Sequence, residues 1–433
     1  MTKIKLYIYI ILVLFIVANI MQKLIMTRKY IDTNLITARV LFMKNMQNCY
    51  VKTRNWSFFI PNCDQYREGE FLEVSGSRSG DSDKGFFQLK RLKVQAVKRI
   101  FLNRFSVKHW WNRALVFIYQ QKDVFLERGL FYLPPTHASL VAGMVFGGTD
   151  FLPQELQQAF QATGLTHVVS ASGYNVSVVA GMVLFLLSKI LSKRFSSLAT
   201  IFFIWSYAIA AELVAPIIRS SIMISLNLIA SRVFFRQYNL LFSLLFTVLV
   251  MLLWEPFYAQ SLSFWLSTLA TLGIILVLPL LEGEESWFSR LSTGHFSDQK
   301  VSTTSNVFQE SFLVTLAAQS LTLPLVITVF GEFSVLSFLT NTVLLWLTPL
   351  ITISGLGLMM VGFLLSPWPG LWQFLAPTLG LVVWLPTELF ISSVGWFGQF
   401  KWGLVKFSLP WWAVGMWWGM LGIIVLRKKC YAH

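Results

Sequence analysis

Apolar residues dominate the chain from Thr163 to Leu426, and polar residues interrupt them only briefly. A helix needs roughly 20 predominantly apolar residues to cross the hydrocarbon core of a bilayer. The runs predict nine spans, at about residues 163–188, 196–214, 215–234, 240–255, 261–281, 312–330, 335–365, 371–397 and 409–426. Residues 335–365 fit a single tilted span or a re-entrant pair. With an uncleaved membrane anchor at residues 1–30, we predict about 9–11 spans, some of them re-entrant.

Alternating apolar positions distinguish residues 31–106 from the rest of the chain. Ile36, Ala38, Val40 and Phe42 follow a period of two, which is typical of a strand. Further strands are expected at residues 56–60, 71–75 and 86–97. In the last of these the apolar phase slips between Leu89 and Leu92, which predicts a β-bulge there. Short strands over about 70 residues predict a small all-β domain of OB type.

Residues 109–133 have apolar positions at helical spacing among charged residues, with Trp110 and Trp111 at their start. This pattern is typical of a helix that lies in the membrane interface, and Pro134 and Pro135 would end it. We therefore assign residues 107–160 to an interfacial helix and a linker. Residues 161–433 are left for the membrane domain.

Composition supports this organisation. Of the 433 residues, 55% are hydrophobic and 13% are charged, about half of the roughly 25% charged residues of soluble proteins. Disorder and an ordinary soluble enzyme are thereby excluded, and a polytopic α-helical membrane protein is predicted.

The net charge of +15 has two sources. With a cytoplasmic amino terminus, alternation of the spans puts the strand domain outside the cell and the carboxyl terminus in the cytoplasm. The basic residues then placed in the cytoplasm obey the positive-inside rule; they are Lys189, Lys193, Arg194, Arg232, Arg236, Arg427, Lys428 and Lys429. Residues 34–106 hold 13 Lys and Arg against 6 Asp and Glu. That external surplus is not explained by the rule and suits a polyanion.

The cysteines and histidines limit the chemistry. The five histidines are solitary, and the sequence has no Cys-x-x-Cys or His-Glu-x-x-His motif, so no metal site and no cofactor are predicted. Cys49 and Cys63 lie close together in the external domain. They are expected either to form a disulfide or to remain two buried thiols.

Polar residues recur on one face of three predicted spans. The stripes begin at Thr163, Gln260 and Thr315 and continue in steps of three or four residues, through residues such as Tyr174, Ser177, Thr271 and Thr322. Small and hydroxylated residues commonly serve helix packing in membranes. The alternative, which we favour for the three stripes together, is a hydrated polar pathway.

Arg219 lies near Pro216 and Glu212, at the junction of two predicted spans. Its planar guanidinium suits an incoming phosphate. The competing interpretations are an ion pair with Glu212 and an extended side chain that reaches the lipid headgroups.

The segment Gly164-Leu-Thr-His-Val-Val-Ser-Ala-Ser-Gly-Tyr-Asn175 resembles the central motif of the ComEC family, the DNA-uptake channels of bacterial competence. The family reads Gly-Leu-x-His-Leu-Leu-x-x-Ser-Gly-x-His. Asn175 stands where the family has His, so a proton-transfer role at this position is not expected, although Asn keeps hydrogen-bonding capacity.

Later segments are similar to the family in the same order: residues 216–223, the stretch around Ser261–Ser267, residues 317–324, Phe330-Gly331 and Asn341 to Pro349. The similarity covers about residues 34–360. Many members carry a further metallo-β-lactamase-like domain. This sequence stops at His433, directly after its last predicted span, and its histidines are solitary, so we expect it to depart from the family by lacking that domain.

The resemblance implies a plasma (inner) membrane, multi-pass channel that passes single-stranded DNA to the cytoplasm during natural transformation, with no enzymatic activity and no nuclease of its own. It also implies contact with membrane lipid, an external DNA receptor, a cytoplasmic helicase or translocase, a separate nuclease, and oligomer formation. The expected DNA pathway consists of His167, Ser170, Ser172, Gly173, Asn175, Arg219, Gln260, Ser263, Ser267, Gln319 and Asn341. The residues expected to guide DNA in the external domain are Tyr50, Lys52, Arg54, Trp56, Lys90, Arg91 and Lys93.

Other functions fit part of the pattern. Broken helices with polar stripes also build the sites of secondary transporters and envelope-lipid exporters for small polar substrates. We find no internal repeat of the kind those transporters usually have, and a basic external domain is not needed for such a substrate. A membrane enzyme lacks a convincing nucleophile and base.

Overall fold

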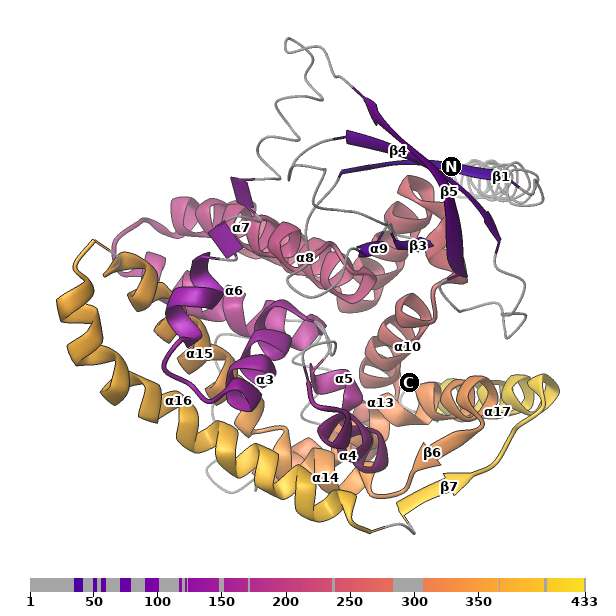
Figure 1. Ribbon diagram of the computed structural model, residues 1–433. Coiled ribbons are helices and arrows are strands. Elements are labelled where there is room, and N and C mark those ends of the chain that lie inside the picture. Colours follow the sequence, from indigo (N-terminus) through magenta and orange to yellow (C-terminus); the bar gives the residue numbers. More distant parts are fainter. Residues whose placement is uncertain are drawn as a thin grey trace. The chain divides into compact units, whose positions relative to one another are not determined.

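The computed structural model describes residues 35–41, 50–52, 56–59, 71–78, 90–100, 117–118, 121–122, 124–147, 152–169, 172–235, 238–282, 307–365, 367–400 and 403–431 (Figure 1). The chain divides into two units. The first comprises Met1–Gln120 and Leu249–Leu262, and the second comprises Gln121–Val248 and Ser263–His433. Each unit is described by itself. The predicted anchor at residues 1–30 and the proposed disulfide partners Cys49 and Cys63 lie outside the described residues.

The first unit contains a five-stranded sheet. Its strands are β1 (Leu35–Leu41), β2 (Tyr50–Lys52), β3 (Trp56–Phe59), β4 (Phe71–Arg78) and β5 (Lys90–Ile100), in the order β1-β4-β5-β3-β2. The β3–β5 pair is parallel, and the other three pairs are antiparallel. Strands were predicted at β1, β3, β4 and β5 but not at β2, whose three residues are too few to display a period of two.

The β-bulge lies on the predicted strand at a different residue. Gly76 of β4 pairs with Val94, and Ser75 pairs with Ala96, so that Gln95 is the extra residue of β5. Lys90 to Leu92 pair regularly with β3, and pairing with β4 is regular from Leu92 to Val94, so the bulge does not fall at the predicted position before Leu92. The shift falls opposite Gly76, because a glycine tolerates the local change in twist.

The second unit is helical. Its helices are α3 (Pro135–Phe146), α4 (Gln154–Thr163), α5 (Thr166–Val169), α6 (Gly173–Ser188), α7 (Lys193–Ala210), α8 (Ala215–Leu228), the π-helical turn η2 (Ile229–Val233), α9 (Leu240–Trp254), α10 (Leu262–Leu276), α11 (Leu278–Glu282), α13 (Val307–Phe330), α14 (Ser337–Leu344), α15 (Leu347–Leu364), α16 (Pro369–Gly398) and α17 (Trp411–Tyr431). A 3-10 turn, η3 (Pro256–Gln260), belongs to the first unit, where α9 also ends.

Among the described residues, four helices are long and apolar enough to cross a membrane, judged by length and composition. They cover Leu262–Leu281, Gln309–Phe330, Leu347–Leu364 and Gly370–Gly398, and three shorter apolar helices cover Gly173–Ser188, Leu240–Trp254 and Trp411–Val425. A multi-pass membrane protein is thereby supported, and the larger number of spans stays a prediction. Residues 335–365 form two helices, the eight-residue α14 and then α15, rather than one continuous span, and a re-entrant pair stays a prediction.

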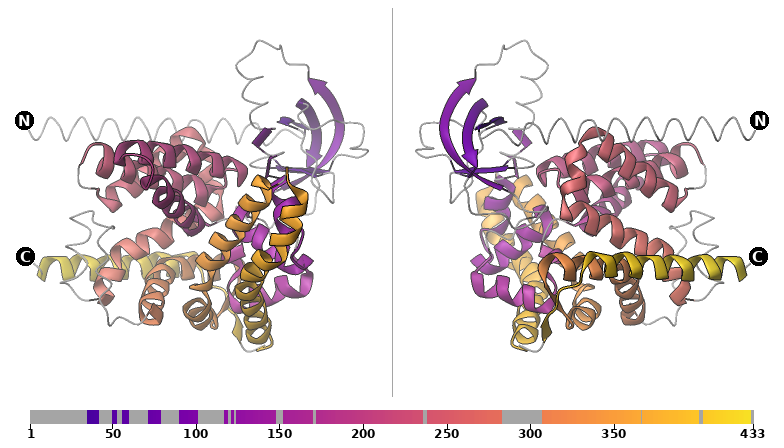
Figure 2. Two further views of the ribbon diagram at one scale, coloured as in Figure 1. Left: turned by 90° about the vertical axis from the view of Figure 1, so that its left-hand side faces the viewer. Right: turned by 90° about the vertical axis from the view of Figure 1, so that its right-hand side faces the viewer.

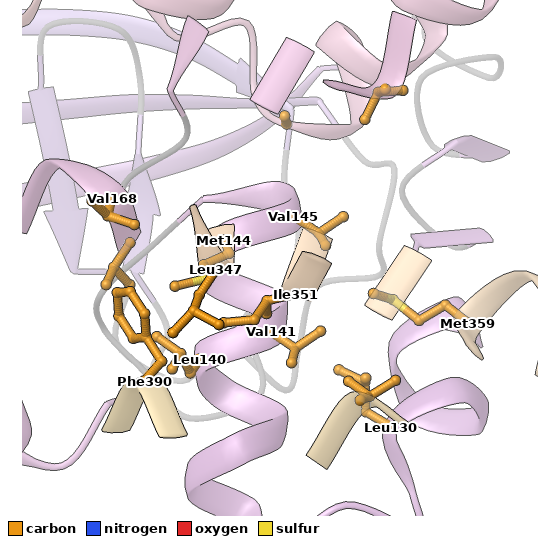
Figure 3. Packing of buried hydrophobic residues seen from close by; sticks show 14 of the residues in the cluster. Leu130, Leu140, Val141, Met144, Val145, Val168, Leu347, Ile351, Met359 and Phe390 are labelled. Atoms are coloured by element: carbon orange, nitrogen blue, oxygen red, sulfur yellow. The ribbon is translucent and has the colours of Figure 1, made fainter. Parts of the chain in front are cut away.

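The main hydrophobic core is built from α3, α4, α6, α15 and α16 (Figure 3). Leu140, Val141 and Met144 of α3 are fully buried and pack with Ile351 of α15 and Phe390 of α16. Leu156 and Phe160 of α4 belong to the same core. The predicted linker before residue 161 thus contains two helices, α3 and α4, that pack in the core of this unit.

Helices α6, α7 and α8 pack against one another, and η2 continues α8 (Figure 2). The long helix α16 lies along α15 (Figures 1 and 2).

Both α3 and α16 start with a proline at their first position. An N–H group at this position would have no hydrogen-bond acceptor within the helix, so its absence in proline costs no helical bond. At the end of α13, Gly331 has a φ of 69°, which favours glycine, and the chain turns there into β6 (Glu332–Ser334). Strand β6 pairs with β7 (Leu404–Lys406).

Helix α17 contacts α13 at a proline. Pro324 cannot donate a hydrogen bond to the carbonyl of Ser320, which is therefore freed inside α13. The indole of Trp417 donates to that carbonyl over 2.8 Å, and the indole of Trp418 donates to Leu321 O over 3.1 Å. These two bonds satisfy polar backbone groups in an otherwise apolar contact.

Candidate polar conduit

The segment that carries the family-like motif is not one span. Helix α4 ends at Gly164, whose φ of 73° lies in the left-handed region, and the four-residue α5 follows. Helix α6 then begins at Gly173, where the Ser172 hydroxyl accepts a hydrogen bond from Asn175 N over 3.4 Å. The predicted span over 163–188, in which Gly164 and Gly173 interrupt the polar stripe of the sequence, is thus broken at both glycines.

Gly173 lies against Arg219 of α8. A Cβ atom at position 173 would be 2.2 Å from Ser220 Oγ and 2.9 Å from Arg219 Nη2. A side chain there would displace both groups, so the contact requires glycine. Gly173 and Arg219, two residues predicted for the pathway, are thereby brought together.

The guanidinium of Arg219 is buried, with 8% of the residue exposed. Its Nε donates to Ser267 Oγ of α10 over 2.9 Å, and Nη2 donates to Ser220 Oγ over 3.3 Å. Its Nη1 is 3.5 Å from the sulfur of Met223. All three partners are electrically neutral, so the charge is solvated only by weak dipoles.

In the described part of the chain, no carboxylate forms an ion pair with Arg219. Glu212 instead lies 3.9 Å from Lys122, so the predicted alternative of an Arg219–Glu212 pair is wrong. The side chain is also buried rather than extended to a lipid surface. A buried cation without a counter-charge is costly, and an anion that reached it would lower that cost.

A second cluster surrounds Gly164. A Cβ atom at this position would be 2.5 Å from Ser337 Cβ. Ser337 Oγ accepts from Gln319 Nε2 over 3.2 Å, and Thr340 Oγ1 donates to Thr163 O over 2.8 Å. The predicted pathway residues Gln319 and Asn341 each keep a buried side-chain oxygen without a partner.

Asn175 caps α3 rather than facing Arg219. It is fully buried, and its Nδ2 donates to Met144 O. Tyr207 of α7 donates to the next carbonyl, Val145 O. Both carbonyls belong to the last turn of α3, where no N–H group of the helix is available to donate to them. The sequence did not point to Tyr207, because its role depends on a contact between residues 62 positions apart.

The other predicted pathway residues are dispersed. His167 is exposed, and its Nδ1 lies 3.1 Å from Gly164 O. Ser263 is exposed at the start of α10, and Gln260 ends η3 in the first unit. Ser170 lies outside the described residues.

Hydroxyls of the three stripes mostly bond within their own helix. Ser177, Thr271, Thr315 and Thr322 each donate to the carbonyl four residues earlier. Such bonds satisfy a hydroxyl without water. These four hydroxyls therefore fit helix packing, whereas Ser267 and Gln319 of the same stripes bond to side chains of other helices, Arg219 of α8 and Ser337 of α14.

The predicted DNA-guiding residues are distributed over both faces of the sheet. By register, Lys52, Ser57 and Arg91 occupy one face, which positions 50 and 93 share. Trp56 pairs with Lys90, and Phe58 pairs with Leu92, so these positions belong to the other face, together with Val74 and Val97. One face is thus rich in basic positions and the other in apolar positions. Arg54 lies outside the described residues.

The described residues contain no group of three or more His, Cys, Asp and Glu that could hold a metal ion. Among the described residues around Arg219, no nucleophile is paired with a base. A guanidinium beside hydroxyl groups is an arrangement that can bind an anion.

Comparison with known proteins identifies the family to which the chain belongs. An uncharacterized protein of Aquifex aeolicus is 38% identical over 135 residues, which are 30% of this chain and 31% of that protein. ComE operon protein 3 of Bacillus subtilis is 21% identical over 210 residues, 48% of this chain and 24% of that protein. The chain thus aligns with less than a third of the length of these relatives. No solved structure matches. The sequence model of the competence protein family matches residues 144–429, well over half of the chain, and the protein therefore belongs to that family of DNA-uptake proteins.

Proposed function

We propose that this protein is a plasma-membrane channel that passes single-stranded DNA into the cytoplasm during natural transformation. The observation that carries the proposal is the buried guanidinium of Arg219, whose partners among the described residues are neutral and which lies against Gly173 of the broken motif. The family supports DNA as the substrate.

The cluster suits a moving phosphate. Arg219 can exchange the hydroxyls of Ser267 and Ser220 for the oxygens of a phosphate, because a guanidinium and a phosphate attract each other as opposite charges and can form two parallel hydrogen bonds. When the phosphate moves on, the hydroxyls take its place again. Conduction needs binding that is favourable enough to admit the polymer and weak enough to release it.

The sheet of the first unit is proposed to be an external OB-type domain that holds DNA before entry. Its order β1-β4-β5-β3-β2 is that of a five-stranded barrel opened between β1 and β2. The face with Lys52, Arg91 and Lys93 would follow the phosphates, as basic grooves of OB domains do. Because Trp56 shares the apolar face, we assign it to the barrel interior and no longer to the DNA surface.

The orientation is proposed from charge. Lys189, Lys193 and Arg194 lie exposed around the α6–α7 turn, and Arg427 is exposed near the end of α17. If these ends are cytoplasmic, the positive-inside rule holds, and the carboxyl terminus is cytoplasmic. A helicase or translocase would pull the strand there, a receptor would deliver it outside, and a separate nuclease would supply the single strand.

The channel is tested with the full chain in proteoliposomes and fluorescent single-stranded and double-stranded oligonucleotides, under an imposed membrane potential. We expect protected fluorescence for the single strand alone, because a duplex has twice the phosphate density and cannot expose its bases. Empty liposomes are the control. Equal protection of both forms would contradict a single-strand channel. Protection of neither, in vesicles where a small polar solute enters, would favour a transporter.

The sheet face has its own prediction. Replacing both Arg91 and Lys93 by Ala should weaken binding of single-stranded DNA to the full chain. The slope of log K against log salt should fall by about 1.4, since each lost phosphate contact removes about 0.7. Fluorescence anisotropy across a salt series measures this slope.

The matched control for the sheet face is Lys90→Ala. Lys90 is adjacent in β5 but belongs to the opposite face, so its replacement should leave the slope unchanged. An equal loss of slope in the control would show that the register does not define the DNA surface.

A further inference from the structure

A histidine and a glutamate meet inside the helical unit, 251 residues apart in sequence. His137 belongs to the first turn of α3 and is 8% exposed, and Glu388 belongs to α16, a candidate membrane span. The distance from His137 Nε2 to Glu388 Oε2 is 2.7 Å. Ser392 Oγ donates to the other carboxylate oxygen over 2.7 Å, and the ring of Trp384 stacks on the imidazole.

The pair is isolated from other charges. Glu388 is the only charged residue of α16, and His137 is the only titratable residue of α3. Of the helices packed against these two, α14 and α15 contain no charged residue. Helix α4 has the exposed Glu155, and α5 has His167. Glu127 and Arg128, just before α3, are exposed. No other described group is therefore positioned to neutralise the pair.

We infer that His137 and Glu388 together bind one proton, and that its release loosens the contact between α3 and α16. With the proton, an imidazolium faces a carboxylate, and the pair has no net charge. Without it, a net negative charge remains on a helix that we treat as a membrane span, where an uncompensated charge is costly. The Glu388 side chain is 41% exposed, so the carboxylate can then turn away from the imidazole.

The unpartnered His137 Nδ1 supports a site with two states. In the structure this nitrogen is buried without a hydrogen-bond partner, whereas Nε2 contacts the carboxylate. Only one side of the ring is thus attached to α16. Rotation of the exposed Glu388 carboxylate is therefore enough to detach the ring from α16.

Helix α3 connects the pair to the motif. Its first turn holds His137, and its last turn supplies the carbonyls of Met144 and Val145 to Asn175 and Tyr207. A shift of α3 would therefore reach α6, the helix that begins at Gly173. The claim that this proton controls the conduit rests on the proposed channel function. The claim that the two residues share a proton does not depend on that function.

The test is hydrogen–deuterium exchange of the full chain in nanodiscs from about pH 6 to about pH 8, corrected for the intrinsic exchange rate. For the wild type we expect exchange of residues 135–146 to rise about tenfold, which corresponds to about 1.4 kcal/mol. In Glu388→Gln the amide still accepts from His137 but cannot ionise, so exchange should stay at the low-pH level. Glu155→Gln on α4 is the matched control and should respond as the wild type does.

The wild-type measurement needs no variant, and a flat response there would overturn the proton site. The same pH response in Glu388→Gln as in the wild type would overturn it too. DNA uptake by Glu388→Gln is measured in parallel. If exchange responds to pH as expected but uptake of the variant keeps the wild-type pH dependence, the proton site stands and its control of the conduit is refuted.

Discussion

Replacing Arg219 by Glu is expected to abolish DNA uptake. The substitution puts a carboxylate beside Gly173, where the proposal requires a cation to meet the phosphates. Losing one member of a buried charged contact costs about 2–5 kcal/mol. Uptake should therefore fall by about 30-fold or more, since 1.4 kcal/mol is a factor of 10. Transformation frequency, with protein quantified in the membrane fraction, measures this effect.

Two further variants separate charge from folding. Arg219→Lys keeps the charge but cannot bond two groups with a planar fork, so partial uptake is expected. Arg219→Gln removes the charge and keeps a donor for Ser267, and it should be as defective as Arg219→Glu. The control is Arg232→Glu in η2, which does not contact Gly173. Normal uptake by Arg219→Glu would refute the role of this residue in binding phosphate.

Replacing Gly173 by Ala should also cause a large loss of uptake, through packing rather than charge. The added methyl would overlap Ser220 Oγ at 2.2 Å and press on Arg219 Nη2 at 2.9 Å. Overpacking of this kind costs about 1–3 kcal/mol. We expect a loss of about tenfold in uptake at normal protein level, because the flexible guanidinium can move aside more readily than the helices can separate.

Gly181 provides the matched control on the same helix. A Cβ atom there meets nothing within 4 Å, so Gly181→Ala should be neutral or slightly stabilising. A second-site change tests the mechanism: Ser220→Ala removes the overlapping oxygen and should restore part of the uptake of Gly173→Ala. Equal defects in Gly173→Ala and Gly181→Ala would show that the contact with Arg219 has no special role. Failure of Ser220→Ala to improve uptake would assign the defect to another neighbour.

Much of the secondary structure was predictable because it depends on neighbours in sequence. Strands β1, β3, β4 and β5 follow from alternation, and the apolar runs correspond to the helices of the second unit. The motif glycines were recognised as interruptions, and Gly164 does end α4. The bulge was misplaced by a few residues, because its position depends on which residue of β4 pairs across it. The contribution of α3 and α4 to the core was missed, since their apolar positions indicate burial but not the partner.

The candidate site was predictable residue by residue but not as an arrangement. Gly173, Arg219 and Ser267 were each identified from sequence. Asn175 and Gln319 were predicted for the pathway on the same grounds, yet they bond elsewhere, to Met144 and Ser337. Arg219 bonds Ser267 across 48 residues, and His137 meets Glu388 across 251. His137 was one of five solitary histidines, because no local pattern encodes a partner so far along the chain.

By itself, the sequence determined that this protein is a multi-pass membrane protein of the competence family, with a net charge of +15 to which residues 34–106 contribute 13 Lys and Arg against 6 Asp and Glu. These properties follow from composition, periodicity and motif order. Only the tertiary structure decided that Arg219 lies against Gly173 with no carboxylate of the described residues paired to it, that Glu212 pairs with Lys122, and that Lys52, Arg91 and Lys93 share one face of the sheet while Lys90 belongs to the other. The physical reason is that a buried charge is defined by what packs around it, and packing between distant segments is set by the fold as a whole.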